Sequence, residues 1–270
     1  MKILKHDAYV LKIFAVVAMI LNHIAIAYVE ILPLGLMIPL YAVGGLTYAV
    51  MAFFIVEGYR HTSNLGKYIG RLLIFGVIAQ AFHPMILGDT AMLPLPFFNI
   101  MFAISLALVV LYLYDHVKIR PLFWLLFVLA CLLSFVIDLF IVSMLVPLLY
   151  HAIKTEERRR WLPGVVMGLF YLLSGAMLAL PAWALHLAGD YDGLQALAAE
   201  VGVSSHFLLV IPLFGLGSLL GAVLVRNFNG ERGRRSKWLF YVAYPVHLAV
   251  LAAIGIAIGV VQFSLFGFVF

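Results

Sequence analysis

Long apolar stretches recur along almost the whole chain, and they constrain its fold more than any other feature. A helix of about 20 apolar residues spans the hydrocarbon core of a bilayer, and only helices or closed barrels satisfy every backbone polar group there. Charged residues make up 11% of the 270 residues and hydrophobic residues 66%, whereas soluble domains carry about 25% charge. The sequence therefore predicts an all-α integral membrane protein, a helical bundle forming a single domain over 1–270.

About nine transmembrane helices, with a range of eight to ten, fit this length. The predicted spans are 8–28, 35–56, 68–87, 98–114, 121–137, 139–153, 162–185, 205–225 and 238–261. The fifth and sixth spans are short, and the pair around Asp138 is also compatible with two re-entrant halves. Pro212 and Pro245 fall inside predicted spans, where they remove backbone hydrogen bonds that neighbours or water must replace.

The basic residues fall in every second connection between these spans. These clusters are Lys2 and Lys5; Arg60, Lys67 and Arg71; Lys118 and Arg120; Lys154 and 158–160; and Arg226, Arg232, Arg234, Arg235 and Lys237. The other connections carry Glu30, Asp89, Asp138, Asp190, Asp192 and Glu200, without a Lys or Arg. The positive-inside rule places the N-terminus in the cytoplasm and the C-terminus outside. The net charge of +5 thus reflects topology, and no nucleic-acid partner is expected.

The first span contains a polar pair, Asn22 and His23, which hydrocarbon cannot hydrogen-bond. Ionisable residues within membrane segments are costly and usually face a bundle interior or a wet cavity, so they are candidates for function. Lys12 lies on nearly the same helical face, about 16 Å nearer the N-terminus. A histidine bonded to a neighbouring carbonyl and a lysine that reaches the membrane surface are the plain alternatives. Together the two side chains form a polar track on which an anion can be held.

A second cluster surrounds the predicted inner end of the second span. Glu57, Arg60 and His61 share one helical face, and Lys67 and Arg71 follow one turn apart at the start of the third span. Positive-inside topology and a local ion pair account for part of this pattern. Four cations within twelve residues also form a plausible phosphate clamp, since Arg binds phosphate bidentately and Lys acts as a point charge.

A third group of polar residues lies in the last span, where Tyr244 and His247 flank Pro245. Tyrosine at a membrane interface is ordinary, but a histidine beside a proline within an apolar helix favours a functional role. Further candidates are Gln80, His83, Asn99 and Asp138. The last three lie near outer ends of predicted spans, where we expect water to satisfy them. Asn99 and Asp138 are our candidates for substrate binding.

Several soluble catalytic sites are excluded by their missing motifs. The sequence contains no His-Glu-x-x-His metal spacing, no Gly-x-Ser-x-Gly elbow and no phosphate-binding glycine-rich loop. We therefore predict no metal site.

Three blocks of residues resemble the TraX-like proteins of bacterial conjugation and fimbrial assembly, which belong among membrane-embedded acyltransferases. The blocks are Leu11-Lys12-Ile13 through Leu21-Asn22-His23-Ile24; 56–62 with Lys67-Tyr68 and 71–75; and Tyr244-Pro245-Val246-His247-Leu248, with a weaker fourth at 99–102. The family usually has an acidic residue before the first-span histidine, and here that residue is Asn22. Glu57 is the nearest alternative acid in sequence. The wider acyltransferase group has Arg where this chain has Lys12, and a paired basic motif that Lys67 and Arg71 approximate.

This resemblance implies transfer of an acetyl group from cytoplasmic acetyl-CoA, the donor substrate, to an acceptor at the outer side of a bacterial inner membrane. For TraX-like proteins the implied acceptor is the N-terminal amine of a pilin subunit, and a protein, sugar or lipid acceptor stays open. Under this hypothesis His23 is the general base or the acyl-accepting residue, and Asn22 or Tyr244 stabilises the oxyanion, with Glu57 and His247 as further catalytic candidates. The cations Lys12, Arg60, His61, Lys67 and Arg71 hold the donor.

Two other functions remain open from the sequence. A transporter or channel for a small solute or ion would use the same intramembrane residues, although transporters more often show repeats and broken helices in both halves, which we do not find. A structural membrane subunit would leave the buried histidine unexplained. The sequence does not determine the oligomeric state.

Overall fold

The computed structural model describes residues 5–87, 97–235, 237–265 and 268–269, and helices dominate this part of the chain. Lys2 and Asp89, which we used for the topology, lie outside it. The helices are α1 Ala8–Ala27, α2 Leu34–His61, α3 Leu65–Gln80, α4 His83–Leu87, α5 Ile100–His116, α6 Arg120–Leu133, α7 Val142–Ala152, α8 Glu156–Ala188, α9 Tyr191–Val201, α10 Ser205–Val210, α11 Leu213–Arg226 and α12 Lys237–Ala257. A 3₁₀ turn, η1 Ser134–Val136, follows α6, and a two-stranded hairpin, β1 Ser264–Leu265 and β2 Phe268–Val269, follows α12.

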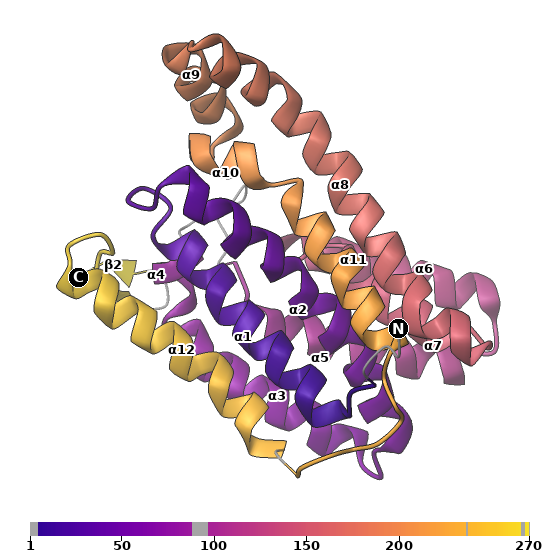
Figure 1. Ribbon diagram of the computed structural model, residues 1–270. Coiled ribbons are helices and arrows are strands. Elements are labelled where there is room, and N and C mark those ends of the chain that lie inside the picture. The colour runs from indigo at the N-terminus through magenta and orange to yellow at the C-terminus, as the bar shows by residue number, and fades with distance from the viewer. Residues whose placement is uncertain (1–4, 88–96, 236, 266–267, 270) are drawn as a thin grey trace.

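Every predicted span coincides with helix in this all-helical bundle (Figure 1). Among the described residues, four helices are long and apolar enough to cross a membrane, namely α1, α2, α8 and α12. The helices α5, α6, α7 and α11 are apolar but shorter. The chain is therefore a membrane protein, while nine crossings and a cytoplasmic N-terminus remain predictions.

Two predicted spans are broken rather than continuous. The span predicted at 68–87 divides into α3 and α4, and the span at 205–225 divides into α10 and α11 around Pro212. A proline cannot donate the backbone hydrogen bond that would continue the helix, and the indole nitrogen of Trp183 donates to the carbonyl of Leu209 beside this break, at 3.0 Å. Our expectation of unbroken helices was wrong at these two places. The connection containing Asp190, Asp192 and Glu200 also forms a helix, α9, which we did not predict.

The basic connections gather at one end of the bundle, which we call the basic end. Arg60 at the end of α2 donates to the carbonyls of Tyr150 and His151 at the end of α7. Arg160 at the start of α8 donates to the carbonyl of Phe228, just after α11. The backbone of His6, before α1, pairs with this same segment. One end of the molecule therefore collects the cations, as the alternating charge pattern predicts.

The acidic connections lie at the opposite end, which we call the far end. There the Tyr28 hydroxyl at the end of α1 donates to the carbonyl of Leu251 in α12, at 2.8 Å. His206 in α10 contacts the carbonyl of Val29 at 3.3 Å. In Figure 1, α9 and α10 lie at this end, away from the N-terminus. The helices α1 and α12 both run from the basic end toward the far end.

Glycines allow α2 and α11 to pack closely at the centre of the bundle. A side chain at Gly45 would overlap the Phe214 carbonyl, and one at Gly217 would overlap the Ala42 carbonyl. Small residues at such contacts let two backbones approach where lipid offers no hydrophobic driving force. On the other side of α2, Thr47 donates to the carbonyl of Ala15 in α1 at 3.2 Å. The helix α2 thereby holds α1 in a fixed register, which positions the polar residues described next.

Candidate functional site

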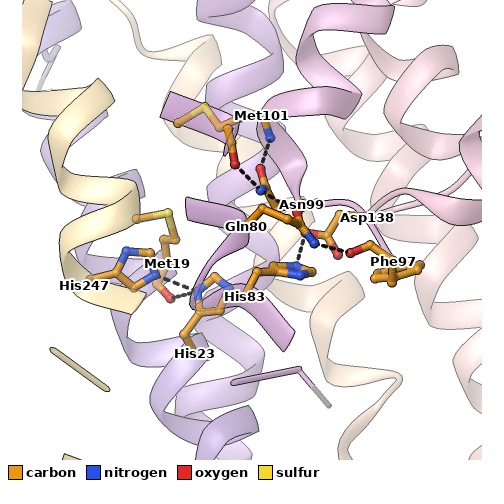
Figure 2. A network of polar contacts seen from close by, with 10 residues as sticks. Met19, His23, Gln80, His83, Phe97, Asn99, Met101, Asp138 and His247 are labelled. Atoms are coloured by element: carbon orange, nitrogen blue, oxygen red, sulfur yellow. Dashed lines mark hydrogen bonds and ion pairs between the residues drawn. The ribbon is translucent and has the colours of Figure 1, made fainter. Parts of the chain in front are cut away.

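Two histidines from α1 and α12 meet inside the bundle. The Nδ1 atom of His23 lies 3.3 Å from Nε2 of His247 and 2.8 Å from the carbonyl oxygen of Met19. The two rings are 4.8 Å apart between centroids. Figure 2 shows the pair bridging the two helices. His23 is sixteen residues into α1, which places it about 22 Å from the basic end of that helix.

The hydrogen bonds define which ring nitrogens carry protons when both rings are neutral. Carbonyl oxygens only accept, so Nδ1 of His23 donates toward Met19, and Nδ1 of His247 donates to the carbonyl of Ala243 at 2.9 Å. The Nε2 atom of His247 then accepts from His23. The Nε2 atom of His23 makes no hydrogen bond to any described residue. This pairing leaves His23 with a free basic nitrogen.

Two buried donors lie on the same helices as this pair. The side-chain nitrogen of Asn22 and the hydroxyl of Tyr244 are buried and donate no hydrogen bond within the described part of the chain, and the Tyr244 oxygen lies near the backbone of Ile100. Tyr244 stacks edge-on against both His23 and His247. Asn22 packs against Gly44 of α2, where a side chain would overlap its amide. Buried polar groups are nearly always paired, so an unpaired donor against the imidazole, Tyr244, and a second on the neighbouring face of α1, Asn22, are compatible with a ligand or water at this place.

Glu57 lies at the other end of the molecule from His23. Since Asn22 packs on Gly44 and α2 runs antiparallel to α1, Glu57 is thirteen residues farther along α2, about 20 Å toward the basic end. Its carboxylate pairs there with Arg60 at 3.4 Å and Arg159 at 3.6 Å. The suggestion that Glu57 replaces the missing acid beside His23 is therefore wrong. The distance follows from the helix register, which nearness in sequence does not reveal.

Asp138 supplies the carboxylate nearest to the histidine pair. Its Oδ2 atom lies 3.1 Å from Nε2 of His83, the first residue of α4, and the His83 side chain is 1% exposed. Both Asp138 and His83 lie within electrostatic range of His23. In Figure 2, His83 lies between the His23–His247 pair and Asp138. Our expectation that water satisfies His83 and Asp138 was wrong, because the two residues satisfy one another.

Asn99 has a different role from the one we predicted for substrate binding. Its Oδ1 atom caps the start of α5 by accepting from the N–H of Met101, at 3.0 Å. Its Nδ2 atom donates to the Gly76 carbonyl and to Oε1 of Gln80, both at 2.8 Å. The side chain is fully buried, and both atoms of its amide are engaged within the protein. Asn99 and Gln80 tie α3 to the start of α5 and thereby support the site.

Two of the predicted donor-binding cations border the first turns of α12. The ammonium of Lys12 lies over the Phe54 and Phe240 rings, 4.8 Å and 5.4 Å from their centroids. The guanidinium of Arg71 lies 6.0 Å from the Tyr241 ring, and its Nε is buried without a hydrogen-bond partner among the described residues. Lys67, one turn before Arg71 in α3, is exposed. Because Phe240 and Tyr241 are adjacent, Lys12 and Arg71 flank one segment of α12.

Arg60 and His61 are not part of this group. The guanidinium of Arg60 is occupied by Glu57 and by two α7 carbonyls, and His61 bonds the Glu57 carbonyl at 2.8 Å. The single phosphate clamp predicted from Arg60, His61, Lys67 and Arg71 therefore divides in two. Lys67 and Arg71 remain beside α12, whereas Arg60 fastens α2 to α7.

The sequence singled out most of these residues but missed their grouping. His23 and His247 lie 224 positions apart, and His83 and Asp138 lie 55 apart. Each was conspicuous alone as a polar residue among apolar neighbours, yet no periodicity connects them. Among the described residues, no three His, Cys, Asp or Glu side chains converge closely enough to hold a metal ion.

Comparison with known proteins gives one family and one curated relative. The family model described as "TraX protein" matches residues 7–255. A protein named "Probable fimbrial assembly protein FimC, serogroup H1" from Dichelobacter nodosus is 29% identical over 264 residues, which covers 92% of this chain and 95% of the relative. No solved structure matches the chain.

Proposed function

Because this chain belongs to the TraX family, we propose that it is a membrane-embedded acetyltransferase of the bacterial inner membrane. It moves an acetyl group from cytoplasmic acetyl-CoA to an acceptor at the outer face, such as the N-terminal amine of a pilin subunit. The name of the fimbrial assembly relative supports an acceptor connected with pili. The observation that carries the proposal is the free Nε2 of His23, with the buried Tyr244 hydroxyl beside its ring and the buried Asn22 amide on the next residue of α1.

The donor enters from the basic end in this proposal. Coenzyme A has a phosphorylated adenosine head and a long, thin pantetheine arm. Lys12 and Arg71, with Lys67 exposed nearby, suit the phosphates, and the arm would follow α1 and α12 toward His23. Lys12 and His23 lie about 16 Å apart along α1, and both contact α12.

In the transfer step the acceptor nitrogen attacks the thioester carbonyl, and His23 Nε2 takes the proton that the nitrogen loses. The hydroxyl of Tyr244 and the amide of Asn22 donate to the oxyanion of the tetrahedral intermediate. The C–S bond then breaks and the thiolate of coenzyme A leaves, taking the proton from His23. A second route forms acetyl-His23 first, with release of coenzyme A, and the acceptor then attacks this intermediate.

The test uses proteoliposomes loaded with acetyl-CoA that carries a radiolabelled acetyl group. A synthetic apolar peptide with a free N-terminal amine is added outside, and the same peptide with a blocked N-terminus is the matched control. Label is expected in the free peptide and absent from the blocked one. No label in the free peptide, in phosphatidylethanolamine or in an added glycoside would contradict the proposed activity.

The two routes differ in one exchange reaction. Without an acceptor, acetyl-His23 formation is reversible and moves acetyl from acetyl-CoA to labelled free coenzyme A, whereas direct transfer gives no exchange. Measuring this exchange for wild type and for His23→Gln distinguishes the routes.

Solute transport is the second candidate, because the breaks between α3 and α4 and between α10 and α11 resemble the discontinuous helices of transporters. Binding separates the two functions. Coenzyme A is expected to raise the melting temperature of the detergent-purified protein, since a ligand stabilises the state that binds it. No shift at millimolar coenzyme A, together with measurable solute flux into liposomes, would favour the transporter.

A further inference from the structure

The His83–Asp138 pair has the geometry of an oriented base. The carboxylate of Asp138 only accepts hydrogen bonds, so Nε2 of His83 carries the proton in the neutral ring. The Nδ1 atom of His83 is then unprotonated, and it makes no hydrogen bond to a described residue. A carboxylate that fixes the tautomer of a histidine in this way leaves the opposite nitrogen ready to accept a proton.

The backbone around Asp138 holds the carboxylate in place. A parallel bridge joins Phe98 to Ile137, in which the N–H of Asp138 donates to the Phe98 carbonyl at 3.0 Å. The next two residues, Leu139 and Phe140, have φ values of 63° and 43°. Positive φ is costly for residues other than glycine and persists only where the surroundings enforce it, often at functional sites. Irregular backbone at membrane depth is tolerated where protein buries it or it lines a wet cavity.

The groups around this pair are few and carry no fixed positive charge. His23 from α1 interacts electrostatically with both residues, and Tyr171 from α8 and Tyr244 from α12 interact with Asp138. Gln80 of α3 bonds the Phe97 carbonyl, and the Phe97 ring stacks on His83. The described connections of the far end, 28–34, 97–99, 134–141, 189–204 and 258–265, contain no Lys or Arg. Within the described part of the chain, the group that a proton on His83 meets first is the Asp138 carboxylate.

Acetylation of an amine requires such a route. An ammonium acceptor reacts as RNH₃⁺ + CH₃CO–SCoA → RNHCOCH₃ + CoASH + H⁺, so one proton leaves for each acetyl group transferred. The acceptor must lose a proton before its nitrogen can attack. His23 returns the second proton to the departing thiolate and ends the cycle neutral, so it does not remove the first. A second base on the acceptor side is needed.

Resting on the proposed function, we propose that His83, positioned by Asp138, takes the first proton from the acceptor ammonium and passes it to the far end of the protein. The site then contains two bases with separate tasks. The His23–His247 pair serves the acyl transfer, and the His83–Asp138 pair prepares the acceptor and removes the released proton. In this proposal Asp138, whose side chain is 16% exposed, passes the proton on from His83 toward that end.

The experiment follows the released proton in the same proteoliposomes, with acetyl-CoA inside and the free-amine peptide outside. A membrane-impermeant pH dye outside counts protons, and radiolabel counts acetyl groups. Wild type is expected to release one proton outside per acetyl group. His83→Gln and Asp138→Asn are expected to lower the transfer rate by about a hundredfold. Raising the outside pH, which deprotonates the peptide before it binds, is expected to recover much of this loss.

Two further variants separate a chemical role from a structural one. Imidazole added outside is expected to restore transfer by His83→Gly in proportion to its unprotonated fraction, and Asp138→Glu is expected to keep most of the activity. The matched controls are His151→Gln and Asp115→Asn, because His151 and Asp115 form a similar pair, 2.8 Å apart, at the basic end. Both controls are expected to retain the wild-type rate and pH profile.

The outcomes distinguish this proposal from the function on which it rests. If wild type transfers acetyl and His23→Ala does not, but His83→Gln and Asp138→Asn keep the wild-type rate and pH profile, the second base is overturned and the acetyltransferase stands. The second base is also overturned if the His83 and Asp138 variants lose activity that neither high pH nor imidazole recovers and if Asp138→Glu is inactive as well. The pair would then have a structural role. A wild type without acetyl transfer removes the proposed function and this inference together.

Discussion

The described part of the chain contains two histidine–aspartate pairs, one at each end of the bundle, and their surroundings differ. The His83–Asp138 side chains are 1% and 16% exposed, whereas those of His151 and Asp115 are 12% and 38% exposed. The second pair lies among hydrogen-bonding partners, since Asp115 also accepts from the Tyr59 hydroxyl at 2.7 Å. The first lies between two histidines and a strained turn. The same two residue types thus occupy a buried position at one end, where we propose a reaction, and a more exposed one at the other.

The cations and the donors show a weaker contrast. At the basic end Arg60 is engaged by two carbonyls and Glu57, as expected of a structural tie. Near the histidine pair, the Asn22 amide and the Tyr244 hydroxyl are buried and donate no hydrogen bond within the described chain. Leaving such groups unpaired costs about 1–3 kcal/mol each. The basic end also has buried nitrogens without a partner among the described residues, namely Nδ1 of His151 and Nε of Arg159 and Arg160. The two ends therefore differ mainly in how deeply their histidine–aspartate pairs are buried.

The largest expected effect is on the histidine that carries the free nitrogen. His23→Ala should lower acetyl transfer by roughly 10²–10⁴-fold. The variant should remain folded, which is checked by its elution as a single species in size-exclusion chromatography in detergent. His186→Ala, at the end of α8, is the control histidine and should transfer acetyl at the wild-type rate. Near-normal activity of His23→Ala would reject His23 as base and as acyl carrier.

A smaller effect is expected from Gly44→Ala, which acts on the site through packing. The added methyl group would overlap the Asn22 amide, so the side chain of the proposed oxyanion donor must move. Losing one oxyanion donor costs about a hundredfold in rate, and overpacking costs about 1–3 kcal/mol of stability. Gly35→Ala in the same helix, where nothing lies within 4 Å of the added atom, is the matched control for both the rate and the melting temperature.

How much of this contrast the sequence could predict depends on the kind of signal. Hydropathy predicted nine spans that all coincide with helix, because burial in lipid requires long apolar runs, but it missed the amphipathic α9. Charge alternation predicted one basic end. Pro212 was noted in the sequence as an internal proline, but the break between α10 and α11 was not predicted, because internal prolines are often tolerated in membrane helices. The pairing of His83 with Asp138 was beyond reach, because it depends on how α4 and the α6–α7 turn pack. Glu57 was misassigned for the same reason, through the unknown register of α1 and α2.

A moderate effect on donor binding is expected from the cations that flank α12. Arg71→Ala removes a guanidinium with an unpaired Nε, and a hydrogen bond to a charged group contributes about 1.5–3 kcal/mol. The KM for acetyl-CoA should therefore rise by about tenfold or more, with little change in kcat. Arg60→Ala should leave KM unchanged and lower the melting temperature, because it releases the α7 carbonyls. A raised KM in Arg60→Ala instead would restore the single phosphate clamp that the sequence predicted.

The smallest effect is expected from Asp115→Asn at the basic end. Because the side chain is 38% exposed and exposed ion pairs contribute about 0–1 kcal/mol, the free energy of unfolding should fall by no more than about 1 kcal/mol, and acetyl transfer should not change. Asp138→Asn keeps the size of the side chain as well, yet it leaves a buried imidazole without its carboxylate, so both stability and rate should fall. Melting curves in one detergent and transfer rates in one vesicle preparation compare the two variants directly. If Asp115→Asn and Asp138→Asn lost the same stability and the same transfer rate, burial would not distinguish the two pairs. The functional assignment of the far end would then lose its physical basis.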